Sequence, residues 1–148
     1  HSENRQLGET DNLINLKIKS AIKSNLKIIF CIGETLKERK AKKTNQILKR
    51  QIEKGLKSIK NKSKIIIAYE PVWSIGTGVI PEKEALIKTI SFIKSRFIKK
   101  YPKILYGGSV NTNNADKLKK IPGIDGFLIG GASQNPKKFI DIIQKSIN

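Results

Sequence analysis

The chain has 148 residues, 26 of them lysine and only four arginine, and its net charge is +18. This length is typical of one domain with a single core, and no apolar run approaches the roughly 18 residues that would indicate a membrane span. The single cysteine, Cys31, excludes an internal disulfide framework and predicts a reducing, cytoplasmic location.

A net charge this high is typical of proteins that bind nucleic acid. The lysines, however, are spread through every segment, and the 26 isoleucines and 11 asparagines point to an AT-rich genome as their origin. The few aromatic residues are too scattered to form a platform for stacking bases. We therefore interpret the charge as compositional and keep a basic nucleic-acid-binding protein as an alternative.

Apolar residues form two kinds of segment that alternate along the chain: short dense runs, typical of buried strands, and longer stretches with helical spacing. A first helix is expected after Thr10 as its N-cap, a second after a capping box of Thr35 and Glu38, and a third with Pro81 in its first turn. Pro122 should end a short fourth helix. The helical stripes lie within residues 13–22, 47–59, 86–97, 115–121 and 139–147, and dense runs predict strands at 27–32, 64–69, 103–106 and 126–129.

The predicted order is one helix followed by four strand–helix units. Runs that are apolar on both faces, each followed by a helix, favour parallel strands covered by helices. Such units build either an open, doubly wound sheet or half of a (β/α)₈ barrel, which needs about 250 residues in full. Length alone favours the open sheet. No linker divides the chain, so we expect one domain over residues 1–148.

The strand ends carry the chemistry, because ligands bind at the carboxyl ends of parallel strands. Gly107-Gly108 is followed by Ser109, and Gly130-Gly131 by Ala132 and Ser133. Paired glycines allow backbone N–H groups to approach an anion, and the last two strands of a barrel often build its phosphate site. Glycines also simply make tight turns, but two such pairs on successive strands favour a phosphate site and the barrel.

The stretch "IIIAYEPVWSIGTG" ends a buried strand with one carboxylate, Glu70. Pro71 biases Glu70 toward an extended conformation, so its side chain should point into the mouth of the site. A surface glutamate paired with a lysine is the plain alternative. A general base is better motivated, because the residues after it are typical of a lid that closes and expels water. Glu34 is a weaker candidate whose neighbours indicate a role at a helix entry.

Five segments, in order, resemble one enzyme family: "HSENRQLGETD" (1–11), "CIGET" (31–35), "AYEPVWSIGTG" (68–78), "YGGSV" (106–110) and "GFLIGGAS" (126–133). Together they resemble triosephosphate isomerase over the whole chain from its first residue. The resemblance implies an α/β fold, the C-terminal half of a (β/α)₈ barrel. The chain would begin with one helix. Four parallel strands, strands five to eight of that barrel, would come after it, each followed by a helix.

The resemblance also implies a site and a reaction. Glu70 would be the base that moves a proton between C1 and C2 of dihydroxyacetone phosphate and glyceraldehyde 3-phosphate, and His1 the neutral electrophile. Glu3 and Cys31 would support them, without any metal or organic cofactor. Phosphate would be held by amides of Gly76, Ser109, Gly130 and Gly131, Leu128 would wall the base, and the lid would be Pro71, Val72, Trp73, Ser74, Ile75, Gly76, Thr77 and Gly78.

Some features of the family are absent from these 148 residues. The chain starts at His1 and has no methionine, so we expect a piece of a longer protein. The lysine and asparagine that the family's first strand supplies have no counterpart, Asn4 and Leu7 replace a usual arginine and aromatic residue, and the loop that forms the family's homodimer lies upstream. We expect negligible activity from the chain alone. Another phosphate-binding barrel enzyme remains an alternative, since paired glycines recur across that fold.

Overall fold

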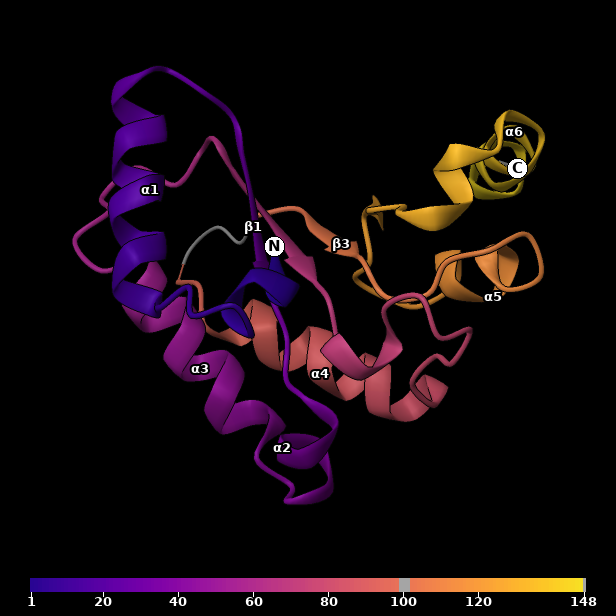
Figure 1. Cartoon of the computed structure of the whole chain (residues 1–148), viewed down its shortest axis with the longest axis horizontal. Coiled ribbons are helices and arrows are strands. Elements are labelled where there is room, and N and C mark those ends of the chain that lie inside the picture. Colours follow the sequence, from indigo (N-terminus) through magenta and orange to yellow (C-terminus); the bar gives the residue numbers. More distant parts are fainter. Residues whose placement is uncertain (99–101, 148) are drawn as a thin grey trace.

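One four-stranded parallel sheet, in the order β1-β2-β3-β4, forms the centre of the chain (Figure 1). A computed structural model describes residues 1–98 and 102–147. The predicted set of parallel strands is confirmed, although the last strand is two residues shorter than expected. The strands are β1 (Ile28–Ile32), β2 (Ile65–Tyr69), β3 (Ile104–Tyr106) and β4 (Gly126–Phe127).

The register of the sheet sets all four carboxyl ends level. Ile32 lies opposite Tyr69, Tyr69 opposite Tyr106, and Tyr106 opposite Phe127. The ladder extends one bond past β4, since the Leu128 N–H donates to the Tyr106 carbonyl at 2.9 Å. The residues that follow the strands therefore line one edge of the sheet.

Helices alternate with the strands in the predicted order. The Thr10 N-cap is confirmed, since its hydroxyl oxygen accepts from the Leu13 N–H at 3.2 Å. The α-helices are α1 (Asp11–Lys23), α2 (Leu36–Lys40), α3 (Thr44–Gly55), α4 (Lys83–Ser95), α5 (Ala115–Lys119) and α6 (Pro136–Ile147), and the 3₁₀ helices are η1 (Ser2–Arg5), η2 (Val72–Ser74) and η3 (Gly131–Gln134).

Two helix predictions need correction. The capping box of Thr35 and Glu38 forms as expected, but the helix that it starts is only α2. Lys42 has a φ of 57°, which ends the helical backbone before α3 begins. Pro81 does not lie in the first turn of α4. It precedes Glu82, which is the extended N-cap residue of that helix.

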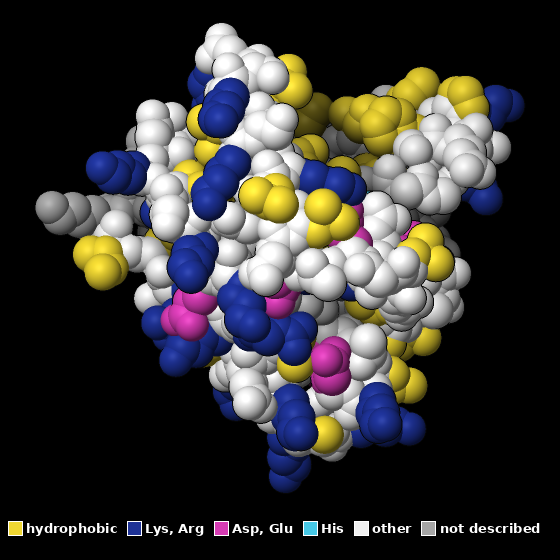
Figure 2. Space-filling model, turned by 60° about the vertical axis from the view of Figure 1, so that its left-hand side comes forward, with side chains coloured by type: hydrophobic (Ala, Val, Ile, Leu, Met, Phe, Trp, Pro, Cys, Tyr) yellow, Lys and Arg dark blue, Asp and Glu magenta, His cyan; other side chains and the backbone are white. Residues whose placement is uncertain are grey.

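Basic side chains are spread widely over one face of the molecule. Figure 2 shows Lys and Arg at many places on this face, with few acidic groups between them. Within residues 1–98 and 102–147, no helix is long and apolar enough to cross a membrane.

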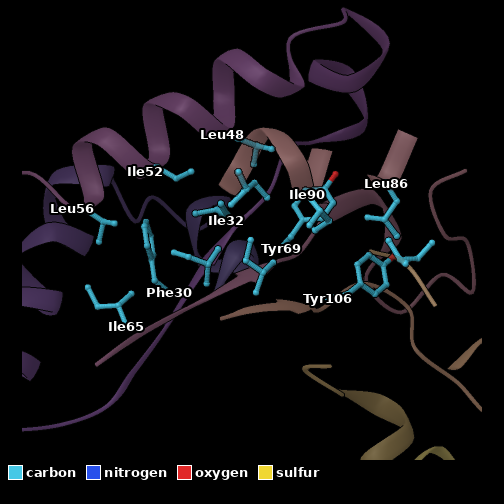
Figure 3. Packing of buried hydrophobic residues seen from close by; sticks show 14 of the residues in the cluster. Phe30, Ile32, Leu48, Ile52, Leu56, Ile65, Tyr69, Leu86, Ile90 and Tyr106 are labelled. Atoms are coloured by element: carbon cyan, nitrogen blue, oxygen red, sulfur yellow. The ribbon is translucent and has the colours of Figure 1, made fainter. Parts of the chain in front are cut away.

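The core lies between one face of the sheet and the helices α3 and α4. Alternate strand residues such as Phe30 and Ile32 belong to this core, and Figure 3 shows Leu48 and Ile52 of α3 on the same side of the sheet as these side chains. The residues on the other face are also apolar but less covered, and Ile29 is 47% exposed. On this second face Cys31 and Ala68 are buried, so the exposed part lies at Ile29, near the start of β1.

Candidate active site

Glu70 directly follows β2 and its side chain is only 1% exposed. Oε1 lies 3.1 Å from Nε2 of His1, and Oε2 accepts the backbone N–H of Ser2 at 2.9 Å. The Glu70 N–H continues the sheet ladder by donating to the Ile32 carbonyl at 2.7 Å. The carboxylate therefore points inward at the mouth of the sheet. The alternative of a surface glutamate paired with a lysine is wrong.

Glycines on the two neighbouring strand ends make room for Glu70. A Cβ atom on Gly33 would lie 1.7 Å from the Glu70 carbonyl oxygen, and one on Gly107 would lie 2.7 Å from its Cγ. The side-chain amide of Gln51 brackets Gly33, accepting from its N–H and donating to its carbonyl, both at 2.9 Å. These glycines thus permit a close approach of the chain to itself.

His1 lies at the start of η1 and is 44% exposed. Its Nδ1 is 3.5 Å from a carboxylate oxygen of Glu3, and its Nε2 faces Glu70. The two ring nitrogens of His1 therefore each face a carboxylate.

Cys31 lies in β1 beside Glu70 and is buried. Burial raises the pKa of its thiol to about 12, and the negative charge of Glu70 adds to the rise. A thiol with such a pKa stays protonated at neutral pH and is a poor nucleophile. Cys31 is thus a buried, protonated thiol beside the carboxylate.

The raised pKa of Cys31 predicts a loss of stability in alkali. The folded pKa lies above the ordinary value of 9.0, so this stabilisation is complete below that pH and is lost as the pH rises toward 12. In urea unfolding at pH 7.5 and 10.5, the parent chain should lose about 2 kcal/mol more than Cys31→Ser. Equal losses in the two proteins would contradict the prediction.

The lid, residues 71–78, is docked onto the end of β3. Its tip uses two glycines with positive φ, Gly76 at 70° and Gly78 at 79°. The Gly78 N–H donates to Oγ of Ser109 at 3.1 Å, and the Ser109 N–H donates to Oγ of Ser74 at 3.2 Å. A glycine is needed at 108 as well, where a Cβ atom would lie 2.6 Å from the Ser74 Oγ.

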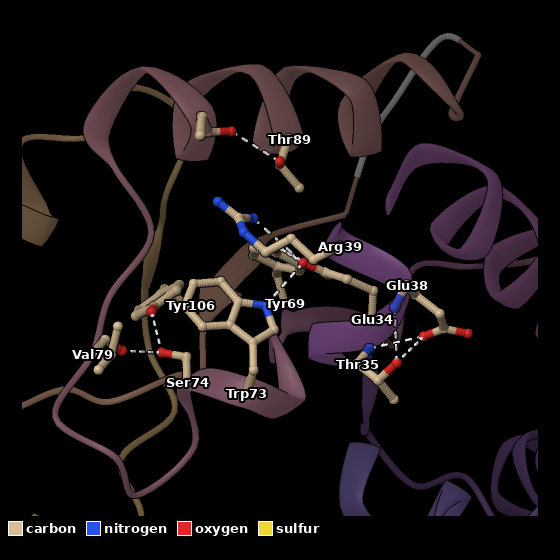
Figure 4. A network of polar contacts seen from close by, with 11 residues as sticks. Glu34, Thr35, Glu38, Arg39, Tyr69, Trp73, Ser74, Val79, Thr89 and Tyr106 are labelled. Carbon is tan, nitrogen blue, oxygen red and sulfur yellow. Dashed lines mark hydrogen bonds and ion pairs between the residues drawn. The ribbon is translucent and has the colours of Figure 1, made fainter. Parts of the chain in front are cut away.

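The entry of the lid is bound to Glu34, which is fully buried (Figure 4). Its carboxylate accepts the indole N–H of Trp73 at 3.1 Å and the hydroxyl of Tyr69 at 3.2 Å. Arg39 lies 3.5 Å from the same carboxylate. The interpretation of Glu34 as a helix-entry residue is wrong, because Thr35 and Glu38 make the cap while Glu34 holds the lid.

The end of β4 lies apart from this network. Leu128 is half-buried, and Gly130 and Gly131 are exposed at the start of η3. Within the described ranges no hydrogen bond joins these glycines to the lid or to Ser109. The structure thus gathers Glu70, His1, Glu3, Cys31 and the lid with Ser109, and leaves the second glycine pair as an open strand end.

Comparison with known proteins identifies this arrangement. Residues 1–146 match the family model described as triosephosphate isomerase. The chain belongs to the triosephosphate isomerase family. Its four parallel strands with their helices accordingly correspond to half of that barrel.

Three curated triosephosphate isomerases illustrate the similarity. The enzyme of Thermodesulfovibrio yellowstonii is 44% identical over 151 residues, covering 97% of this chain and 61% of that protein. That of Mycoplasma mobile is 47% identical over 145 residues, with 97% and 60% covered. That of Geobacter metallireducens is 46% identical over 153 residues, with 97% and 61% covered. The chain thus spans about three fifths of the length of the triosephosphate isomerases it matches.

Proposed function

We propose that the chain serves in a triose-phosphate isomerase, which interconverts dihydroxyacetone phosphate and glyceraldehyde 3-phosphate through an enediolate. One observation carries the proposal: the buried carboxylate of Glu70, at the strand end beneath the lid, faces the Nε2 of His1 at 3.1 Å. A base and a hydrogen-bond donor side by side are what proton transfer next to a carbonyl requires.

In the proposed reaction, Glu70 removes a proton from C1 of the ketose and returns it to C2, while the hydroxyl proton on the oxygen of C1 passes to the oxygen of C2. His1, through the Nε2 proton, hydrogen-bonds the substrate oxygens on which negative charge develops. Because Glu70 and His1 contact each other in this structure, substrate has to enter between them. The Ser2 N–H holds Oε2 of Glu70, which leaves Oε1 as the oxygen that faces His1 and the substrate.

The lid and the strand ends hold the phosphate in this proposal. The Gly76 amide and those of Gly130 and Gly131 donate to the phosphate oxygens, and the Ser109 amide joins them by exchanging its bond to Ser74 Oγ for one to the phosphate. The bond from Gly78 to Ser109 supports this arrangement, since it brings the lid tip over the end of β3. Lid closure excludes water during proton transfer, a device for which this family is itself a standard example.

We propose that residues 1–148 form one partial barrel domain, strands five to eight of the complete enzyme. The exposed part of the second face of the sheet, at Ile29, supports a requirement for further strands. The complete enzyme is a cytoplasmic homodimer that acts on a small phosphate ester without metal or organic cofactor. Nucleic acid is not a partner in this function, and steeply salt-dependent DNA binding would contradict that point.

The isolated 148 residues should have negligible isomerase activity, because the outer edges of β1 and β4 have no strand partner among the described residues and His1 is 44% exposed. The test is a coupled assay of the purified 148 residues beside a completed barrel. We define the completed barrel as this chain co-expressed with the part of the Mycoplasma mobile enzyme that it does not match. Turnover by the chain alone within a hundredfold of the Mycoplasma mobile enzyme would contradict the expectation, and restored turnover in the completed barrel would support the proposed function.

A further inference from the structure

Trp73, at the entry of the lid, is held by two charged side chains from outside the lid (Figure 4). Its indole N–H donates to Glu34 at 3.1 Å, and the guanidinium carbon of Arg39 lies 4.5 Å from the centre of its ring. Arg39 also reaches the Glu34 carboxylate, with Nη1 3.5 Å from Oε1. The three groups form a closed triangle of contacts, which we call the tryptophan clamp.

We propose that Arg39 is a positioning residue of the lid, which keeps it closed by stacking on Trp73 while pairing with Glu34. The proposal rests on the proposed function only in treating residues 71–78 as a lid. Arg39 touches neither the proposed substrate nor Glu70. It acts through Trp73, by favouring the lid position in which Gly78 bonds Ser109.

An arginine is needed for both contacts at once. A planar guanidinium can lie over an aromatic ring and donate from its edge to a carboxylate, whereas a lysine ammonium is a point charge that cannot do both equally well. All four arginines of this lysine-rich chain make contacts of these two kinds. Arg5 and Arg50 share the carboxylate of Asp11, and Arg96 lies over Phe92 at 5.7 Å.

Helix α2 fixes the position of Arg39. The helix is only five residues long, and its start is held by the reciprocal bonds of Thr35 and Glu38. The Arg39 N–H donates to the Thr35 carbonyl at 3.0 Å. The capping box adjoins Glu34 in sequence, so one short segment carries both the anion and the cation of the tryptophan clamp.

The burial of Glu34 explains why the clamp favours the closed lid. When the lid opens, Glu34 loses the indole donor and keeps only Tyr69 and Arg39. A buried carboxylate that loses a donor is destabilised, and Arg39 loses its ring at the same time. Both losses favour closure, so Arg39 and Glu34 set the fraction of molecules with the lid closed.

Trp73 is the only tryptophan of the chain, so its fluorescence reports directly on the clamp. Acrylamide quenching should be compared among the parent chain, Arg39→Ala, Arg39→Lys and the matched control Arg96→Ala, whose arginine also stacks on an aromatic ring. We expect Arg39→Ala to raise the quenching constant about two- to fivefold, the change that loss of an exposed cation–π contact would produce. Arg39→Lys should restore the parent value only in part, and Arg96→Ala should leave it unchanged.

The same variants are also measured in the completed barrel, with the part from the Mycoplasma mobile enzyme made free of tryptophan. Instability of the isolated chain then cannot hide the result. Unchanged quenching in Arg39→Ala, or full restoration by Arg39→Lys, would overturn the proposal. If Arg39→Ala fails to fold in both forms, Arg39→Lys decides. The readout does not depend on turnover, so failure of the clamp and failure of the isomerase proposal give different results.

Discussion

Replacing Glu70 by Gln in the completed barrel should lower kcat by about 10²–10⁴-fold, the usual contribution of a positioned general base. The amide keeps the size of the side chain and an acceptor for the Ser2 N–H, so the fold should persist. The loss should appear in kcat more than in KM, because the base acts in proton transfer and the phosphate contacts are untouched. A coupled assay of purified variants measures both constants.

Glu3→Gln is the matched control for this experiment. Glu3 lies 3.5 Å from the far nitrogen of His1 and does not contact Glu70, so the same change there should have a much smaller effect. Exchange of substrate hydrogen with solvent should fall with kcat in Glu70→Gln. Turnover by Glu70→Gln within tenfold of the parent would indicate a different base and favour another kind of phosphate-binding barrel enzyme.

Replacing Gly33 by Ala should destabilise the chain by about 3 kcal/mol or more, the upper end of overpacking effects. The new Cβ would lie 1.7 Å from the Glu70 carbonyl oxygen, which is backbone and cannot rotate away. The ends of β1 and β2 would have to separate, and the bond from the Glu70 N–H to Ile32 would lengthen. Urea unfolding followed by circular dichroism measures the change.

Gly131→Ala provides the comparison, because a Cβ atom there meets nothing within 4 Å. This variant should stay within about 0.5 kcal/mol of the parent, as most surface changes do. If Gly33→Ala were as stable as Gly131→Ala, the close approach of the two strand ends described above would be wrong. A selective loss of activity in Gly131→Ala would support its proposed phosphate role.

The strands and helix starts could be predicted because their signals are local. Runs such as residues 64–69 are apolar on both faces, and the Thr10 cap and the box of Thr35 and Glu38 form within four residues of sequence. Parallel strands then bring their ends to one edge, which is why Glu70 could be placed from sequence. The break at Lys42 could not be predicted, since a positive φ at a lysine leaves no sequence signal.

The sequence did not predict the contacts of Glu34, Arg39 and Gly33, because each of these residues meets residues more than 30 positions away along the chain. Glu34 looked like part of a helix entry because the cap lies next to it, while its real partners lie 35 and 39 residues away. One signal did exist for Arg39. In a chain with 26 lysines and four arginines, each arginine marks a position where a planar, forked cation is required.

The contact between Ser2 and Glu70 spans 68 positions of sequence. Closing so long a loop costs conformational entropy that must be offset by other contacts first. We therefore expect α3, β1 and β2 to assemble before η1 docks, and the pairing of His1 with Glu70 to be among the last events of folding. A molecule arrested before that step would have a native-like sheet without the pairing of Glu70 and His1, so in the completed barrel turnover would report complete folding more strictly than secondary structure does.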